Sequence, residues 1–171
     1  PEGAIYEVLN VMGTLESGSA GPIDFGQGTM DVGQAMSVPI ISQLKKKHLA
    51  AGNDGRVVIL DAQPGTSCPV VEAVRGADYV ILVTEPTPFG LHDLKLAVGM
   101  VRELRVPFGV VVNRIGIGDD RVHVFCEQEK IGVLLEIPDD RRIAEAYSDG
   151  VSLIEVLPAY RARFLELYAQ L

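Results

Sequence analysis

The sequence predicts an α/β domain in which a mostly parallel sheet is flanked by helices. After residue 56, short and continuous runs of Val, Ile and Leu alternate with amphipathic stretches. Continuous apolar runs of this length are typical of strands that are buried on both faces, as in parallel sheets. Repeated strand–helix units build layered domains with right-handed crossovers, and these place helices on the faces of the sheet.

Four apolar runs are the expected strands of this sheet: residues 56–60 (RVVIL), 79–84 (YVILVT), 108–112 (FGVVV) and 132–137 (GVLLEI). Helices are expected between them. Thr87 is a predicted cap with Pro88 at the first helical position, and the apolar residues that follow recur at helical spacing: Leu91, Leu94, Val98 and Val101.

Two more helices are expected near the end of the chain. Asp139 or Asp140 caps the first of them, and Gly150 terminates it. The second follows Pro158 and places these side chains on one side: Tyr160, Phe164, Leu167, Tyr168 and Leu171.

Residues 1–36 have a different character. This segment is rich in Gly and Ser and has weak periodicity, which predicts loops and a short hairpin. Residues 37–47 (SVPIISQLKKK) are expected to form a helix that leads into the strand at 56–60. The stretch FGQGTMDVG (25–33) superficially resembles a phosphate-binding loop, but it lacks the Lys followed by Ser or Thr that a P-loop requires.

Composition excludes several classes of partner. The net charge of −8 argues against nucleic acid, because phosphate binding relies on clustered Lys and Arg. The basic run Lys45–His48 is interpreted as a solvated helix C-terminus rather than as an anion site. No apolar run approaches the roughly 20 residues of a membrane span. Two separated cysteines form no disulfide framework, so a reducing cytoplasm is the expected location.

Polar residues follow each expected strand. In open α/β sheets ligands bind beyond the carboxyl ends of the strands, so these positions are the candidate site: Asp61, Thr84, Glu85, Asn113, Arg114, Pro138 and Asp139. Asp61 is suited to hold magnesium-bound water or to orient an attacking water. Gly65 lets backbone N–H groups approach a phosphate, with Thr66 or Ser67 as further donors, and the Asn113 amide can read a base edge.

A purely structural interpretation stays open for each of these positions. Asp, Pro, Gly, Thr and Ser are also favourable residues for strand–helix turns and N-caps. Only their joint placement at successive strand ends favours a functional site. Cys68 invites a nucleophile or metal-ligand interpretation, but no His is tied to it by the sequence, so a packed or helix-terminal Cys is favoured.

Three stretches together resemble the MinD/ParA/Mrp group of P-loop ATPases, most narrowly the MinD-superfamily ATPases with an inserted ferredoxin domain. They are VVILDAQPGTSCPVVEAVRGADYVILVTEPTPFGLHDLKLAV, FGVVVNRIGIGDD and EIPDDRRIAEAYSDG. The resemblance covers nearly the whole chain and is strongest from Arg56 to Gly150. One departure is Gln63, where this group usually has Pro.

The resemblance implies ATP or ADP and Mg²⁺ as ligands and a P-loop NTPase-like fold. Asp61 would be the catalytic and metal-binding acidic residue, and Gly65 and Thr66 would sense the γ-phosphate. Thr84 and Glu85 match the family's VTEPT strand end, and Asn113, followed by Arg114, matches the residue that reads adenine. Pro138 and Asp139 match the loop around the base. A homodimer or a hetero-complex with a related ATPase is implied as well.

The same resemblance places this chain as the C-terminal part of a longer parent. Residues 37–171 are expected to be the C-terminal portion of the nucleotide-binding domain, and residues 1–36, which begin PEGAI, are expected to follow a ferredoxin-like insert. The Walker A loop, the first strand and the cysteines for 4Fe-4S clusters would belong to the parent. We expect the isolated chain to be inactive in ATP hydrolysis, because the loop and its Lys supply most of the charge stabilisation in phosphoryl transfer.

The missing strand would leave two sheet edges unpaired. The expected outcomes are that another copy or chain supplies it, that the sheet rearranges, or that the fragment arose by cleavage after folding. Two other functions remain open for the chain. It is alternatively a non-catalytic interaction or regulatory module, or an iron–sulfur carrier in which two copies share a cluster.

Overall fold

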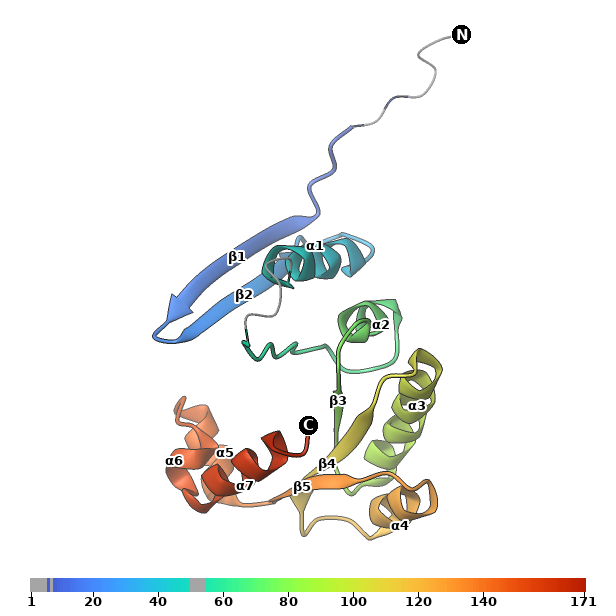
Figure 1. The fold of residues 1–171 in the computed structure, drawn as a ribbon, viewed down its shortest axis with the longest axis vertical. Coiled ribbons are helices and arrows are strands. Elements are labelled where there is room, and N and C mark those ends of the chain that lie inside the picture. The colour runs from blue at the N-terminus through green and yellow to red at the C-terminus, as the bar shows by residue number, and fades with distance from the viewer. Residues whose placement is uncertain (1–5, 7, 50–54) are drawn as a thin grey trace. The chain divides into compact units, whose positions relative to one another are not determined.

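The structure is a computed structural model that describes residues 6, 8–49 and 55–171 (Figure 1). The PEGAI start of the 1–36 segment lies outside the described residues. The chain divides into two compact units, unit 1 (Pro1–Arg75) and unit 2 (Gly76–Leu171), and each is described by itself.

Unit 1 begins with the expected hairpin. β1 (Gly13–Ala20) pairs antiparallel with β2 (Ile23–Met30), with Ala20 opposite Ile23. Gly21 occupies the two-residue loop with a φ of 59°, a conformation that favours glycine at hairpin turns. α1 (Val38–Leu49) follows and packs on both strands, which confirms the helix expected at 37–47.

Glycines explain why α1 packs closely on the hairpin. A Cβ at Gly28 would collide with the Ile40 side chain, and one at Gly26 would collide with the His48 ring. Ser17 and His48 are also hydrogen-bonded, with 3.1 Å between Oγ and Nε2. The FGQG stretch that superficially resembles a phosphate loop therefore lies on a strand, where its glycines make room for a helix.

α2 (Cys68–Val74) is held to α1 by Lys45. Lys45 Nζ donates to the carbonyl oxygens of Glu72, Ala73 and Arg75 at 2.7, 3.0 and 2.6 Å. These carbonyls lie at the C-terminus of α2 and lack partners within that helix. Burial lowers the pKa of the Lys45 ammonium, the nearby Glu72 carboxylate opposes this shift, and Arg75 adds to it.

The strand expected at 56–60 does not form, and this part of the prediction is wrong. Residues 56–63 have no regular secondary structure, and Val57, Val58 and Ile59 are more than half exposed. An apolar run becomes a strand only where a neighbouring strand completes its ladder, and no described strand pairs with these residues. The run is apolar enough for a buried strand but lacks a pairing partner in the described part of the chain.

Unit 2 contains the other three predicted strands, which confirms the α/β fold with a parallel sheet. They are β3 (Val80–Thr84), β4 (Phe108–Ile115) and β5 (Val133–Pro138), paired in the order β3-β4-β5. Both ladders are parallel. The carboxyl ends of the three strands therefore lie at one edge of the sheet.

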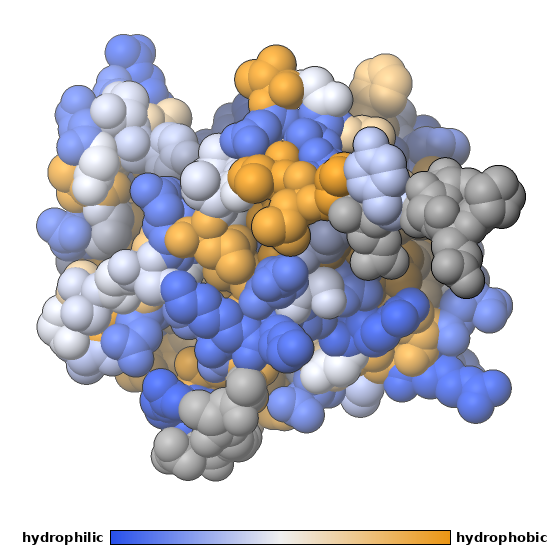
Figure 2. Space-filling view, turned by 90° about the horizontal axis from the view of Figure 1, so that it is seen from above, coloured by the Kyte–Doolittle hydropathy of each residue, from blue (hydrophilic) through white to orange (hydrophobic). Residues whose placement is uncertain are grey.

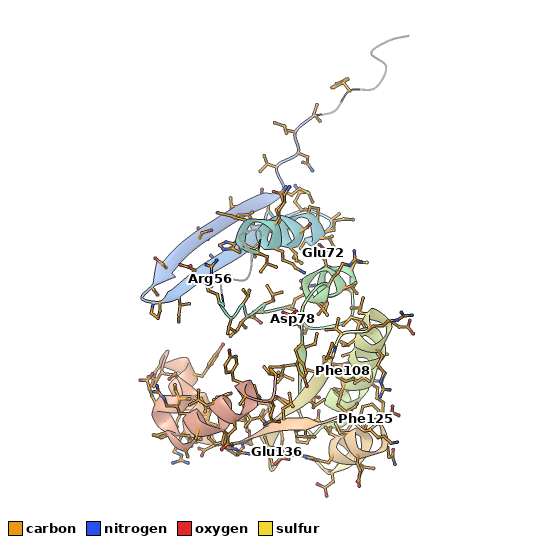
Figure 3. The ribbon with its side chains drawn as sticks, viewed as in Figure 1. Arg56, Glu72, Asp78, Phe108, Phe125 and Glu136 are labelled. Atoms are coloured by element: carbon orange, nitrogen blue, oxygen red, sulfur yellow. The ribbon has the colours of Figure 1, made fainter. Side chains whose placement is uncertain are left out.

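Helices cover both faces of β4. On one face, Val110 and Val112 pack with α3 (Pro88–Leu104) and α4 (Arg121–Gln128). Phe108 and Phe125, both labelled in Figure 3, pack against this cluster. On the other face, Val111 packs with Leu135 of β5 and Leu167 of α7 (Ala159–Tyr168). Alternate residues of β4 thus enter two cores, as expected for a strand that is buried on both faces.

β3 buries one face only. Val80 and Thr84 are buried, whereas Ile81 and Val83 are 39% and 65% exposed. The helix on that side of the sheet, α7, packs on β5 and on the Val111 side of β4. Exposed apolar side chains occur in both units, and Figure 2 shows such side chains among polar ones on one face of the molecule.

The predicted helix ends are confirmed in unit 2. Thr87 caps α3 by accepting a hydrogen bond from the Gly90 N–H at 3.0 Å. Asp140, one of the two proposed caps, begins α5 (Arg141–Ser148), and Gly150 follows its end with a φ of 72°. The short α6 (Leu153–Val156) precedes α7. None of the helices in the described ranges is both long and apolar enough to cross a membrane.

Candidate nucleotide site

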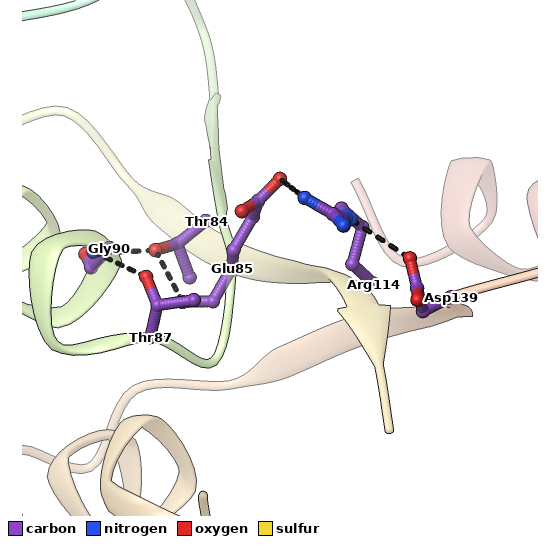
Figure 4. Close-up of polar contacts among 6 residues, drawn as sticks. All are labelled: Thr84, Glu85, Thr87, Gly90, Arg114 and Asp139. Atoms are coloured by element: carbon purple, nitrogen blue, oxygen red, sulfur yellow. Dashed lines mark hydrogen bonds and ion pairs between the residues drawn. The ribbon is translucent and has the colours of Figure 1, made fainter. Parts of the chain in front are cut away.

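Three strand ends bring six of the predicted site residues to one edge of the unit 2 sheet. Figure 4 shows four of them: Thr84, Glu85, Arg114 and Asp139. Thr84 ends β3 and Glu85 follows it. Asn113 and Arg114 lie in β4, Pro138 ends β5, and Asp139 follows β5. Because neighbouring parallel strands end together, residues far apart in the sequence become neighbours here. This is the edge at which open α/β sheets bind their ligands.

Arg114 joins the three strand ends. Its Nη1 lies 3.5 Å from Glu85 Oε1, and its Nε donates to Asp139 Oδ1 at 2.9 Å. The pKa of Arg114 is raised, first by the hydrogen bond with Asp139 and then by the charges of Asp139 and Glu85. All three side chains are partly exposed, so these ion pairs fix geometry more than they add stability.

The backbone of β4 is irregular where it carries this arginine. The register with β5 shifts between Val112 and Ile115, and Arg114 has a φ of 59°. A non-glycine residue rarely takes that conformation, and such bulges re-aim side chains beside functional sites. The irregularity places Asn113 and Arg114 beside Pro138 and Asp139 on the wall of one cleft.

Thr84 acts within the turn that follows β3. It is the one buried polar side chain among the described residues, and its hydroxyl donates to the Gly90 carbonyl at 2.9 Å. A Cβ at Gly90 would collide with the Glu85 carbonyl, so this close turn requires glycine there. Thr84 therefore fixes the path of the chain from β3 into α3 and sets the position of Glu85.

A cleft of about 260 Å³ opens between the strand ends and α5. Its polar lining consists of Asn113, Arg114, Asp139 and Asp140, and its apolar lining consists of Pro138, Ile143, Ala144 and Tyr147. A smaller cleft of about 130 Å³ is lined by Pro86, the 115–120 loop and His123. The larger cleft combines apolar walls with a few hydrogen-bonding groups, as small-molecule sites do.

The charges around the larger cleft are nearly all paired. Arg114 lies between two carboxylates, Arg142 binds Asp140 at 2.6 Å, and Arg141 binds Glu145 at 2.7 Å. The hydrogen bonds from Arg142 lower the pKa of Asp140. Because each of these cations already has a carboxylate partner, the cleft offers a polyphosphate little net attraction. It is better suited to a planar, largely uncharged group.

Sequence reasoning missed several residues near this edge. His123 Nε2 lies 2.6 Å from Glu136 Oε1, and the Tyr160 hydroxyl donates to the Glu136 carbonyl at 3.1 Å, so both residues position β5. Glu136 is labelled in Figure 3. Ile143 and Tyr147 line the cleft from α5. The two residues are four positions apart on the helix that Asp140 caps, and this spacing is the sequence signal that places them on one helix face.

The other three predicted site residues belong to unit 1. Asp61 lies in the irregular segment and is exposed, Gly65 has a φ of 106°, and Thr66 precedes α2 by two positions. The positive φ at Gly65 explains why a glycine follows Pro64. Within unit 1 these residues lie on the segment that leads into α2. Because the strand expected at 56–60 does not form, Asp61 does not stand at a strand end, and that part of the prediction is wrong.

The cysteines differ in environment. Cys68 is exposed at the start of α2, whereas Cys126 is buried in the core between α4 and β4. Burial raises the pKa of the Cys126 thiol, which opposes a ligand role. In the ranges that the structure describes, no three His, Cys, Asp or Glu side chains gather in an arrangement that could hold a metal ion.

Comparison with known proteins gives the family relationship. The chain is 38% identical over 128 residues to an uncharacterized protein of Methanocaldococcus jannaschii, covering 75% of the chain and 44% of that protein. It is 29% identical over 152 residues to the iron-sulfur cluster carrier protein of Pyrococcus horikoshii, covering 78% and 51%. The MinD cell division protein of Aquifex aeolicus has a similar fold, with a TM-score of 0.60, 17% identity and coverage of 78% and 60%.

The chain is related to MinD-type P-loop ATPases. It spans about half the length of the curated relatives that it matches. No family model matches it. The MinD-like fold is shown by the structural neighbour, and the parallel sheet of unit 2 agrees with it.

The residues of the larger cleft fit one of the two ligands that the resemblance implies. The amide, carboxylate and apolar lining of the larger cleft fits a nucleotide base. An iron–sulfur cluster does not fit, because the ligand set of four cysteines is absent from the sequence and one of the two cysteines is buried.

Proposed function

We propose that this chain carries the adenine side and the magnesium-and-water side of an ATP site in a MinD-like ATPase associated with iron–sulfur clusters. The observation that carries the proposal is the cleft beyond β4 and β5, lined by Asn113, Arg114, Pro138 and Asp139. The family resemblance assigns Asn113, Pro138 and Asp139 to the base, and these residues come from two separate strand ends.

The chemistry of the cleft supports a base rather than a phosphate. The Asn113 amide offers both a donor and an acceptor, and Asp139 offers acceptor oxygens. Adenine presents an exocyclic amino group that donates to such acceptors, whereas guanine presents a carbonyl at the same ring position. Arg114 is held by Glu85 and Asp139, so the edge carries no surplus positive charge for phosphates. We therefore assign the base of ATP to this cleft.

The magnesium side rests on the loop after residue 60. Asp61 is exposed and offers oxygen ligands of the kind that Mg²⁺ prefers, usually through water. Gly65 and Thr66 offer backbone and hydroxyl donors toward a phosphate. When bound, Mg²⁺ would neutralise negative charge on the phosphates. Asp61 would hold the water molecules that coordinate Mg²⁺ and would orient the attacking water.

The wider setting is inferred from the relatives. Two MinD-type subunits sandwiching nucleotide, as a homodimer or as a hetero-complex with a related ATPase, would complete the site. Iron–sulfur clusters would belong to the parent protein, since this chain does not supply their ligands. Both cysteines are free, which supports a reducing cytoplasm as the location.

Isothermal titration calorimetry with Mg-ATP tests the proposal. Asn113→Ala should weaken ATP binding by about tenfold, because two base hydrogen bonds are lost. Glu166→Gln on α7 is the matched control, since it changes an exposed side chain that does not line the cleft. Equal affinity of the Asn113→Ala variant and the wild type for ATP would contradict the base assignment.

A non-catalytic interaction module is the competing function. The observations that favour it are the exposed apolar run at 57–60 and the exposed Ile81 and Val83 on β3. The same titration separates the two functions. If neither Mg-ATP nor Mg-ADP produces heat at millimolar concentration, the nucleotide proposal fails and the interaction module is favoured.

A further inference from the structure

Tyr147 is a highly exposed aromatic residue on α5. It is 84% exposed, although it lines the larger cleft together with Ile143 and Ala144. Phe89 on α3 is equally exposed but does not line the cleft. The Tyr160 and Phe125 rings have partners. Tyr160 donates to the Glu136 carbonyl and packs with Phe164, and Lys95 lies over the Phe125 ring. Among the described residues, no aromatic or cationic side chain is in contact with the Tyr147 ring. The ring is exposed on the wall of the cleft.

The helix that carries Tyr147 is fixed at both ends. Asp140 accepts a hydrogen bond from the Arg142 N–H at its start, and Ala146 is buried in its middle. At its end, the Val151 N–H donates to the Ala146 carbonyl at 2.8 Å, and the Gly150 N–H donates to the Tyr147 carbonyl at 3.2 Å. The backbone of residue 147 is therefore held in place, and the ring has only two side-chain torsions to fix on binding a ligand.

The ring is also placed where a flat ligand would need a wall. Ile143 and Tyr147 lie one turn apart on the same face of α5, and Pro138 with Asn113 forms the strand side of the cleft. The hydrogen-bonding side chains of Asn113 and Asp139 lie on the strand side, and the apolar side chain of Ile143 and the Tyr147 ring lie on the helix side. An aromatic heterocycle satisfies both, because its edge forms hydrogen bonds while its face packs on apolar atoms.

The two arginines of α5 are engaged with carboxylates rather than with this ring: Arg141 pairs with Glu145, and Arg142 pairs with Asp140. We propose that Tyr147 is a stacking platform for the adenine base, across the cleft from the hydrogen-bonding side chains of Asn113 and Asp139. This inference rests on the proposed nucleotide function and adds a specificity-determining residue to it.

Calorimetric titration with Mg-ATP and with AMP tests the platform. Base–aromatic stacking contributes roughly 1–3 kcal/mol, so Tyr147→Ala should weaken both ligands by about 5- to 150-fold. Tyr147→Phe keeps the ring and should stay within about threefold of the wild type. Tyr168→Ala on α7 is the control, because it removes an aromatic ring that is 56% exposed and does not line the cleft.

The outcomes separate this inference from the function on which it rests. If the wild type binds Mg-ATP and Tyr147→Ala binds it equally well, the stacking role is overturned while the nucleotide site stands. If the wild type binds no nucleotide, both fail. Ribose 5-phosphate supplies the base-free probe: an equal loss of its binding in Tyr147→Ala would show that the ring does not act through the base.

A direct readout is available because the chain contains no Trp. Tyr147→Trp introduces a single tryptophan at the platform, and adenine stacked on it should quench its fluorescence. Ribose 5-phosphate should leave the signal unchanged. Absence of quenching at an ATP concentration that saturates the calorimetric signal would overturn the proposal.

Discussion

At the scale of single residues, glycines determine much of what this chain can build. Gly90 allows the tight turn after β3, and Gly26 and Gly28 let α1 approach the hairpin. The sequence shows these residues plainly, but it does not show which of them face a neighbour. FGQG is compatible with a phosphate loop, a flexible linker or a close-packed strand, and only the approach of Ile40 and His48 decides among them.

Gly28 gives a sharp test of this packing. Gly28→Ala places a Cβ against the Ile40 side chain, and a β-branched residue has few rotamers into which it can move. We expect a destabilisation of about 1–3 kcal/mol, as for other overpacked sites. Hydrogen exchange of the β1 and β2 amides measures it.

Gly18→Ala is the matched control for this test. Gly18 is on β1, and a Cβ there would meet no atom within 4 Å. Its exchange rates should equal those of the wild type or be slower. Equal protection in the Gly28→Ala and Gly18→Ala variants would contradict the packing argument.

At the scale of elements, the sequence predicted the unit 2 strands and helix starts because their signals are local. Thr87 with Pro88 marks the start of α3, and Asp140 marks the start of α5. The strand at 56–60 failed because its formation depends on a partner, which no local pattern contains. The Arg114 ion pairs were equally hidden, since they join three elements that are distant in the sequence.

The Asp140 cap predicts a pH dependence of stability. The hydrogen bonds from Arg142 lower the pKa of Asp140 from its ordinary value of 3.8. As the pH falls, the Asp140 carboxylate is therefore protonated in the unfolded chain before it is protonated in the folded chain. The contribution of the cap to the free energy of unfolding is complete above pH 3.8 and is lost as the pH falls through the folded-state pKa. Thermal unfolding of the wild type should show this loss.

Asp140→Asn separates the charge from the cap. The amide keeps an acceptor for the Arg142 N–H but does not titrate, so its thermal midpoint should lie below that of the wild type at neutral pH. The gap should narrow on acidification below pH 3.8. Asp149→Asn makes the same change of net charge at the other end of α5. A constant gap between wild type and Asp140→Asn at every pH would contradict the shifted pKa.

At the scale of the whole molecule, the distribution of positive charge separates base binding from phosphate binding. Of the five lysines, Lys45 is committed to three backbone carbonyls, and Lys95 lies 5.5 Å from the centre of the Phe125 ring. No Lys of the sequence follows a glycine-rich turn. Arg114 at the cleft is bound by two carboxylates. Among the described residues that line the cleft, the one cation, Arg114, is therefore already paired, so the cleft offers no unpaired cation to a triphosphate.

This distribution predicts that nucleotide affinity hardly depends on phosphate number. ATP, ADP and AMP should bind the purified chain within about threefold of one another, because a threefold ratio corresponds to only about 0.7 kcal/mol. Added salt should change these affinities little, since few charges are neutralised on binding. ATP turnover should be at background, because the charge stabilisation of phosphoryl transfer is missing. Calorimetry at two salt concentrations and a phosphate-release assay measure all three quantities. ATP binding at least tenfold tighter than AMP binding would instead locate a phosphate cradle in this chain, and Gly65→Val would then test whether the loop after Asp61 forms it.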